Sequence, residues 1–145
     1  MTQEEIKEIT KDWKEPFKSV VNYPRFSIDY HLNDGMNDHE WLEDRGYELY
    51  MGCDCAYYII GIYSLLATSY GDWGSCYVNE DTLDEGFELF LQMYKDGVVK
   101  LWRIHIFLDD KQGEPQHYSY NDEYGVWETY DNKFSKWIEC DNPLK

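Results

Sequence analysis

The sequence predicts an α+β fold, with an antiparallel sheet of about five or six strands covered by N-terminal, central and C-terminal helices. Apolar residues recur at helical spacing through residues 82–97, and they alternate as in a half-buried strand through residues 98–108. Further alternating runs are separated by Asn, Asp and Gly, which is typical of strands joined by turns. The 145 residues contain no linker or internal repeat, so we expect a single domain spanning 1–145.

The N-terminal helix is indicated by Thr2 and Glu5, which fit a capping box. Its apolar side holds Ile6, Ile9 and Trp13, and Pro16 interrupts or restarts it. Residues 25–32 follow as a half-buried strand that alternates Phe26, Ile28 and Tyr30 with Ser27, Asp29 and His31.

An acidic stretch and an ambiguous apolar stretch come next. Asn33, Asp34 and Gly35 predict a turn, and Asp38 is the expected N-cap of a short helix that carries Trp41 and Leu42 and ends near Gly46. Residues 47–70 fit a helix or strands, and we favour a strand at 47–51, a turn at 52–55 and one strand through residue 65. A turn at 71–74 and a short strand at 75–78 complete this part.

The central helix has the strongest signals. Thr82 and Glu85 form a second capping box, and Gly97 is the expected left-handed stop. The apolar face is formed by Leu83, Phe87, Phe90, Leu91 and Tyr94. The strand that follows should place Trp102, Ile104, Ile106 and Leu108 on one side.

The C-terminal third predicts a hairpin and a closing helix. Residues 109–113 have the composition of a hairpin loop, and strands are expected at 116–120 and 126–130 around a turn at 121–125. Asn132 is the expected cap of a last helix, with Phe134, Trp137 and Ile138 on its inner side.

Charge is the strongest global property, because the net charge is −16 and its distribution is uneven. Residues 26–94 contain 14 acidic residues and one basic residue, Arg45. Binding of a phosphate backbone needs a basic stripe, so direct contact with nucleic acid is not expected. The sequence shows neither a signal peptide nor an apolar run of membrane-spanning length, and we therefore expect a cytoplasmic protein without membrane contact.

The four cysteines give a weak metal signal. Cys53, Cys55 and Cys76 with a histidine are conceivable zinc ligands, but the usual paired spacing is missing. In a reducing compartment we expect free thiols and no cofactor.

A histidine and arginine face is the main candidate for chemistry. If the hairpin loop is centred near Gln112, His117 lies opposite Phe107 and Ser119 lies opposite His105. Arg103, His105, His117 and Ser119 would then share one sheet face, which suits acid–base or phosphate chemistry. We favour the interpretation that it is the ordinary polar face of an antiparallel hairpin. No catalytic motif accompanies it, so we do not expect an enzyme, and a small enzyme or ligand-binding domain remains the alternative.

In overall character the chain resembles small acidic inhibitors, namely phage anti-defence proteins that mimic nucleic acid and immunity proteins that neutralise a toxin. The resemblance is compositional and transfers no residues. It implies a non-catalytic inhibitor that occludes a basic protein such as a nuclease, a toxin or a nucleic-acid-binding effector.

The expected partner-binding residues lie in the acidic segment, where carboxylates provide steering and aromatic side chains provide anchors. They are Asp34, Asp38, Glu40, Glu43, Asp44, Asp72, Glu80, Asp81 and Asp84, with Trp41 and Trp73 as anchors. Two other interpretations stay open: the charge serves solubility alone, or the chain is a structural subunit of a larger assembly. The oligomeric state is not predicted.

Overall fold

The computed structural model describes residues 1–21, 23, 25–53, 56–68, 72–78, 85–109, 115–131 and 133–143. In these residues nine strands form one antiparallel sheet in the order β2-β3-β4-β5-β1-β6-β7-β8-β9, accompanied by four helices. The α+β class and the antiparallel sheet are confirmed, but the sheet is larger than the expected five or six strands.

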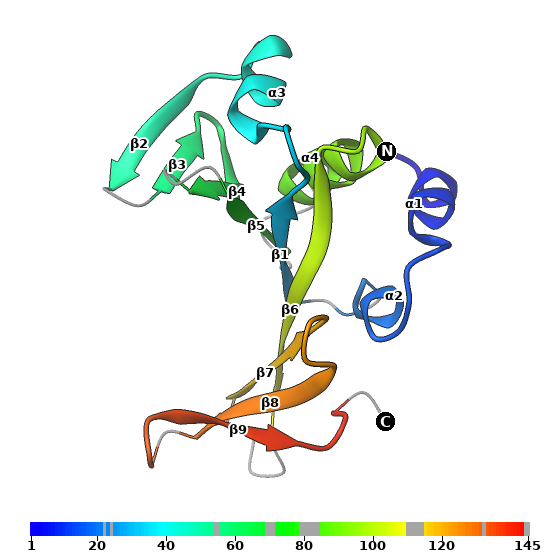
Figure 1. Ribbon diagram of the computed structural model, residues 1–145, viewed down its shortest axis with the longest axis vertical. Coiled ribbons are helices and arrows are strands. Elements are labelled where there is room, and N and C mark those ends of the chain that lie inside the picture. Colours follow the sequence, from blue (N-terminus) through cyan, green and yellow to red (C-terminus); the bar gives the residue numbers. More distant parts are fainter. Residues whose placement is uncertain are drawn as a thin grey trace.

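The bounds of the elements are as follows. The helices are α1 (Gln3–Thr10), α2 (Phe17–Val20), α3 (Asp38–Asp44) and α4 (Glu85–Lys95). The strands are β1 (Phe26–Leu32), β2 (Leu49–Cys53), β3 (Ala56–Ile59), β4 (Ile62–Thr68), β5 (Trp73–Val78), β6 (Val99–Asp109), β7 (Pro115–Asn121), β8 (Val126–Asp131) and β9 (Lys136–Cys140). The long strand β6 links an upper part, formed by β2 to β5 with α3 and α4, to a lower part formed by β7 to β9 (Figure 1).

The core lies between α4 and the central strands β1 and β6. Ile28 and Ile104 are fully buried on the sheet side, as the alternating sequence predicts. On the helix side Phe90 is fully buried and stacks on Tyr30, with ring centroids 5.8 Å apart. Trp13, from the segment after α1, packs edge-on against Phe90. This aromatic layer fixes α4 over the centre of the sheet.

The start of α1 and the end of α4 lie at the capping residue and the glycine that the sequence predicts. Thr2 caps α1 by accepting a hydrogen bond from the backbone N–H of Glu5 at 3.1 Å. Gly97 has φ of 77° and ends α4, while Val98 N–H donates to the carbonyl of Met93 at 2.9 Å. Thr82, Leu83 and Asp84 of the second capping box lie outside the described residues.

A register shift in the β1–β6 pairing moves Trp102 to the unexpected face. Tyr30 pairs with Leu101 and Asp29 pairs with Arg103, so Trp102 is an extra residue in β6. Its ring stacks on His31 at 4.1 Å, on the face opposite the core. The expectation that Trp102 shares a side with Ile104 is therefore wrong, because strict alternation does not survive a bulge.

The cap of α3 also differs from the expectation. Asn37, and not Asp38, caps the helix by accepting from the backbone N–H of Glu40 at 3.1 Å. Asp38 is instead the first helical residue and is only 1% exposed. Either residue type can cap a helix, so the sequence does not distinguish one position from the next.

The expected single strand before residue 65 is two strands. Gly61 has φ of 87°, and the chain turns there so that β3 pairs antiparallel with β4. The apolar residues on both sides of Gly61 have high strand propensity, which hides the turn in the sequence.

The expected C-terminal helix is wrong, because β9 occupies this segment. Asp131 accepts from the backbone N–H groups of Lys133 and Phe134, and the turn ends at Ser135 with φ of 52°. Trp137 then pairs with Tyr130 of β8. The apolar spacing of this short segment is helical, but pairing with the neighbouring strand β8 stabilises a strand instead. The local sequence pattern contains no information about that pairing.

The predicted β6–β7 register is confirmed, with His105 opposite Ser119 and Phe107 opposite His117. The residues of the loop, 110–114, lie outside the described part of the chain. Along the described residues, no helix has the length and apolar character needed to cross a membrane.

Candidate functional site

An acidic surface surrounds α3. We define it by exposed carboxylates that take part in no ion pair within the described part of the chain: Asp34, Glu40, Glu43, Asp44, Glu48 and Asp72. Five of the expected partner-binding carboxylates belong to it. Glu80, Asp81 and Asp84 lie outside the described residues.

The one basic residue in this segment is already engaged inside the molecule. Arg45 Nη2 bonds Asp96 Oδ2 at 2.9 Å, and Arg45 Nη1 donates to the carbonyl of Trp41 at 3.0 Å. The guanidinium lies 3.6 Å from the centre of the Trp41 ring, in cation–π contact. The positive charge of Arg45 therefore faces Asp96 and Trp41 and leaves the acidic surface uncompensated.

Two expected contact residues, Asp38 and Trp41, are buried and serve the fold. Asp38 Oδ2 accepts a hydrogen bond from the Tyr30 hydroxyl at 2.8 Å. Burial raises the pKa of the Asp38 carboxyl and raises the pKa of Tyr30 well above 10. Trp41 is 7% exposed, and its Nε1 donates to Asp96 at 2.9 Å. The sequence pattern did not show that these two side chains point inward.

Exposed apolar side chains accompany the carboxylates. Met36, Tyr50, Met51 and Ile60 are 46%, 40%, 52% and 56% exposed, and all belong to the segment of highest negative charge. Trp73, the other expected anchor, is half-buried and packs edge-on against Trp102 at 5.9 Å. Apolar anchors among charged residues are typical of protein interfaces.

A histidine cluster lies on the sheet face opposite the core, and it consists of Asp29, Arg103, His105 and His117. Asp29 Oδ2 accepts from Arg103 Nε at 2.8 Å and bonds His105 Nε2 at 3.0 Å. His105 Nδ1 lies 2.8 Å from His117 Nε2. The cluster brings together the arginine and both histidines expected from the hairpin and adds Asp29 from β1, which the sequence placed on a polar side without a partner. Ser119 is buried opposite His105, but no hydrogen bond joins the two side chains.

The hydrogen bonds determine the protons of the cluster. His105 Nε2 faces a carboxylate and therefore carries a proton. When His105 is neutral, its Nδ1 is an acceptor and His117 Nε2 must donate. Burial opposes ionisation of Asp29, but His105 and Arg103 outweigh it and lower the carboxyl pKa. Burial, together with the charges of His105 and Arg103, lowers the pKa of His117 to about 4.

Aromatic rings hold the outer histidine in place. The His117 ring stacks on Phe107 at 4.6 Å and meets Trp137 edge-on at 4.7 Å. Trp137 in turn contacts Tyr130 at 5.5 Å. Phe107, His117, Tyr130 and Trp137 thus form a row across β6, β7, β8 and β9 that fixes the orientation of His117.

The conceivable zinc ligands are only partly described. Cys76 is fully buried opposite Ile28, and burial raises the pKa of its thiol far above 9. The side chain of Cys53 and all of Cys55 lie outside the described residues. No group of three or more His, Cys, Asp or Glu side chains suited to a metal ion occurs in the described part of the chain.

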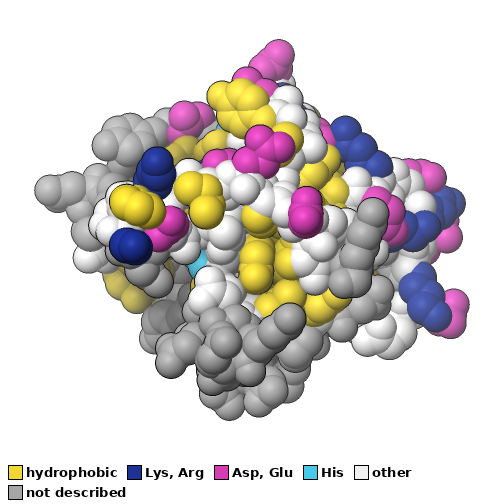
Figure 2. All heavy atoms as spheres, turned by 90° about the horizontal axis from the view of Figure 1, so that it is seen from below, with side chains coloured by type: hydrophobic (Ala, Val, Ile, Leu, Met, Phe, Trp, Pro, Cys, Tyr) yellow, Lys and Arg dark blue, Asp and Glu magenta, His cyan; other side chains and the backbone are white. Residues whose placement is uncertain are grey.

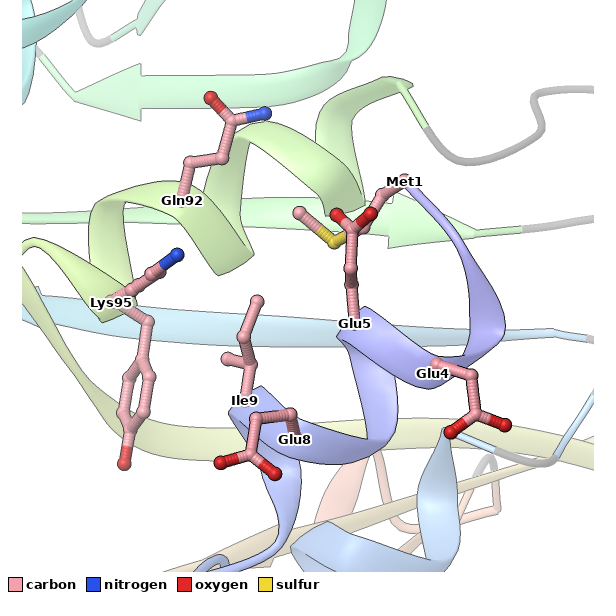
Figure 3. A pocket seen from close by; sticks show the side chains of 8 residues that line it. Met1, Glu4, Glu5, Glu8, Ile9, Gln92 and Lys95 are labelled. Atoms are coloured by element: carbon pink, nitrogen blue, oxygen red, sulfur yellow. The ribbon is translucent and has the colours of Figure 1, made fainter.

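A groove lies between α1 and α4, with a volume of about 720 Å³. Figure 3 shows the residues that line it, with Glu5, Glu8 and Ile9 on α1 and with Gln92 and Lys95 on α4. These are ordinary exposed residues of two packed helices, and they do not converge on a common point. The groove therefore offers less specific chemistry than the histidine cluster.

The end of the molecule away from α3 has mixed charge. Figure 2 shows apolar side chains across this face, with Lys and Arg side chains toward both margins and Asp and Glu side chains among them. Phe134 is 63% exposed here, and Lys133 and Lys136 lie close to its ring.

Comparison of the chain with models of protein families, with characterised proteins and with solved structures gives no significant match. What the protein does must therefore be inferred from its own residues and their geometry.

Proposed function

We propose that this protein is a non-catalytic inhibitor that uses the acidic surface around α3 to bind and occlude a basic protein. The main supporting observation is that six exposed carboxylates form no ion pair with any described residue, while Arg45 is bonded to Asp96. A basic surface that normally holds nucleic acid is the complementary partner, because carboxylates can take the places of phosphates. A nuclease, a toxin or a nucleic-acid-binding effector fits this description, with the protein acting in the cytoplasm.

The position of two carboxylates supports a binding role over a purely structural one. Glu43 and Asp44 lie in the last turn of α3, where the helix dipole disfavours negative charge, and no basic residue occupies that turn. Each costs the helix about 0.3–1 kcal/mol at that end. Solubility needs negative charge somewhere, but it does not need it at the unfavourable end of a helix.

The test compares two charge-reversal variants that change the net charge equally. Glu43→Lys with Asp44→Lys reverses the acidic surface, and Glu123→Lys with Glu139→Lys reverses two exposed carboxylates elsewhere. Immobilised protein is used to capture basic proteins from a cell lysate at low and high salt, and excess duplex DNA is then added. We expect capture that weakens steeply with salt, because exposed charges are screened over about 10 Å at 0.1 M.

The expected pattern is specific. The Glu43→Lys/Asp44→Lys variant no longer captures the basic protein, whereas the control variant still does. Duplex DNA displaces the basic protein from the immobilised, unsubstituted protein. Equal loss in both variants would show that only net charge matters. Capture indifferent to salt and to DNA would contradict the proposal altogether.

A second candidate function is a small enzyme or ligand-binding domain, and the Asp29–His105–His117 hydrogen-bond chain favours it. A carboxylate that orients one histidine, which in turn bonds a second, is an arrangement suited to moving or holding a proton. Replacing His105 and His117 together by Gln should abolish ligand binding and leave partner capture intact. If that variant also lost partner capture, the histidine cluster and the acidic surface would serve the same function.

A further inference from the structure

The two ring nitrogens at the centre of the histidine cluster come from adjacent strands. His105 is in β6 and His117 is in β7, at diagonal positions of the confirmed register. Their facing nitrogens, Nδ1 and Nε2, are 2.8 Å apart and share one proton. An ion that accepts both lone pairs can take the place of this proton.

The separation of the nitrogens favours one coordination geometry. A metal bonded to both at about 2.0 Å, in cis positions of a square-planar or tetragonal site, holds them about 2.8 Å apart. A tetrahedral ion such as zinc would hold them about 3.3 Å apart, which requires the two strands or rings to separate. Cu(II) prefers the tetragonal geometry and binds imidazole most strongly among the common divalent ions.

The surroundings already contain the outer support that a histidine ligand needs. Asp29 bonds His105 on the ring nitrogen that faces away from His117, at 3.0 Å. A carboxylate in this position fixes the tautomer and orientation of a ligand and raises its basicity. Arg103 bonds the same Asp29 oxygen at 2.8 Å, so the carboxylate is itself held in place. Phe107 and Trp137 confine the ring of His117.

We propose that His105 and His117 form a two-histidine site for Cu(II), with Asp29 as the positioning residue for His105. The inference rests on the ligand-binding alternative and is independent of the acidic surface. On binding, the shared proton leaves His117 Nε2 and a proton is taken up on His117 Nδ1, so that both ligands remain neutral imidazoles and no net proton is released. Both rings turn so that their lone pairs converge on the ion. No third side chain of a ligating type completes the site among the described residues, so water or an added chelator fills the other positions.

The test uses Cu(II) iminodiacetate, which leaves two cis positions open for imidazole. The full chain is titrated and followed by electron paramagnetic resonance and by tryptophan fluorescence, because Cu(II) quenches nearby indoles and Trp137 touches His117. We expect one equivalent to bind with a tetragonal signal from two imidazole nitrogens. His105→Gln and His117→Gln should each abolish this two-nitrogen signal.

Two further variants separate positioning from general effects. Asp29→Asn should weaken binding by about 10–100-fold while keeping the two-nitrogen signal, because it removes the outer carboxylate and not a ligand. His31→Gln is the matched control, since His31 stacks on Trp102 away from the pair, and it should bind as the parent does. Circular dichroism verifies that each variant is folded.

Three experimental outcomes would contradict the proposed Cu(II) site. A parent chain that binds no Cu(II) iminodiacetate, a signal dominated by sulfur ligation, or binding unchanged in His117→Gln would each reject it. None of these results affects capture by the acidic surface, so the failure of one proposal is distinguishable from the failure of the other.

Discussion

The two buried carboxylates on β1 and α3 show how differently the two ends of the molecule treat charge. Asp29, beside the β6–β7 hairpin, is bonded to Arg103 and His105. Asp38, beneath the acidic surface, is bonded through Oδ2 to the neutral Tyr30 hydroxyl, and its Oδ1 has no hydrogen-bond partner. Asp29 is thus neutralised by cationic side chains, whereas Asp38 is held by a neutral hydroxyl and has only His39 Nε2 near its other oxygen, at 3.9 Å. The carboxylates of the acidic surface are exposed to water and form no ion pair with the described residues.

This difference separates charge that supports the fold from charge that is available to a partner. In the histidine cluster, the negative charge of Asp29 is matched by Arg103 and His105 within the molecule. Around α3, Arg45 is matched to Asp96, and the exposed carboxylates form no ion pair with the residues that the structure describes. A basic partner would therefore be attracted to the α3 end, while the hairpin end offers an ordered cluster to a small ligand.

Breaking the matched cluster should have the largest effect on stability. Asp29→Ala leaves Arg103 and His105 without their acceptor, and we expect a loss of about 3–5 kcal/mol in the free energy of unfolding. Asp44→Ala, in the exposed acidic surface, should instead raise it by about 0.3–1 kcal/mol, because a negative charge is removed from the C-terminal end of α3. Denaturant unfolding measures both values. Similar losses in the two variants would erase the distinction between matched and free carboxylates.

An intermediate effect is expected from the hydrogen bond between the Tyr30 hydroxyl and Asp38. Tyr30→Phe removes the side-chain hydrogen bond to a buried carboxyl, at a cost of about 1–3 kcal/mol. Tyr124→Phe is the matched control, because Tyr124 is 70% exposed. Equal midpoints for the two variants in denaturant would show that the Tyr30–Asp38 bond contributes nothing net.

The smallest effect concerns pH and His31. Partial burial lowers the pKa of His31 below 6.5, and the nearby charge of Lys100 acts in the same direction. Because the unfolded chain then binds more protons, the contribution of His31 is present above its unfolded pKa and is lost as pH falls from there through the folded pKa. Nuclear magnetic resonance titration should place the His31 midpoint below 6.5. A midpoint at or above 6.5 would contradict this, and His31→Gln should flatten the dependence of stability on pH in that window.

The elements predicted best are those whose cause is local. The Thr2 cap, the turn at Gly97 and the burial of Phe90 follow from side chains within a few residues. The hairpin register could also be predicted, because a short loop fixes which residues of two adjacent strands face each other. That register was enough to bring His105 and His117 onto one face.

The elements predicted wrongly are those that a distant strand decides. Trp137 and Ile138 have helical spacing, but pairing with β8 makes the segment a strand. Asp29 joins the histidine cluster because β1 lies beside β6, although 74 residues separate it from Arg103. Neither pairing leaves a signal in a single sequence.

By itself, the sequence determined the α+β class, the central helix and strand, the negative charge around residues 26–94 and the shared face of the two histidines. The tertiary structure decided which carboxylates are exposed, that Asp38 and Trp41 face inward, and that Asp29 orients His105. The physical reason is range: helix caps, turns and alternation act between near neighbours, whereas the burial and partners of a charge depend on strands that meet only when the chain has folded.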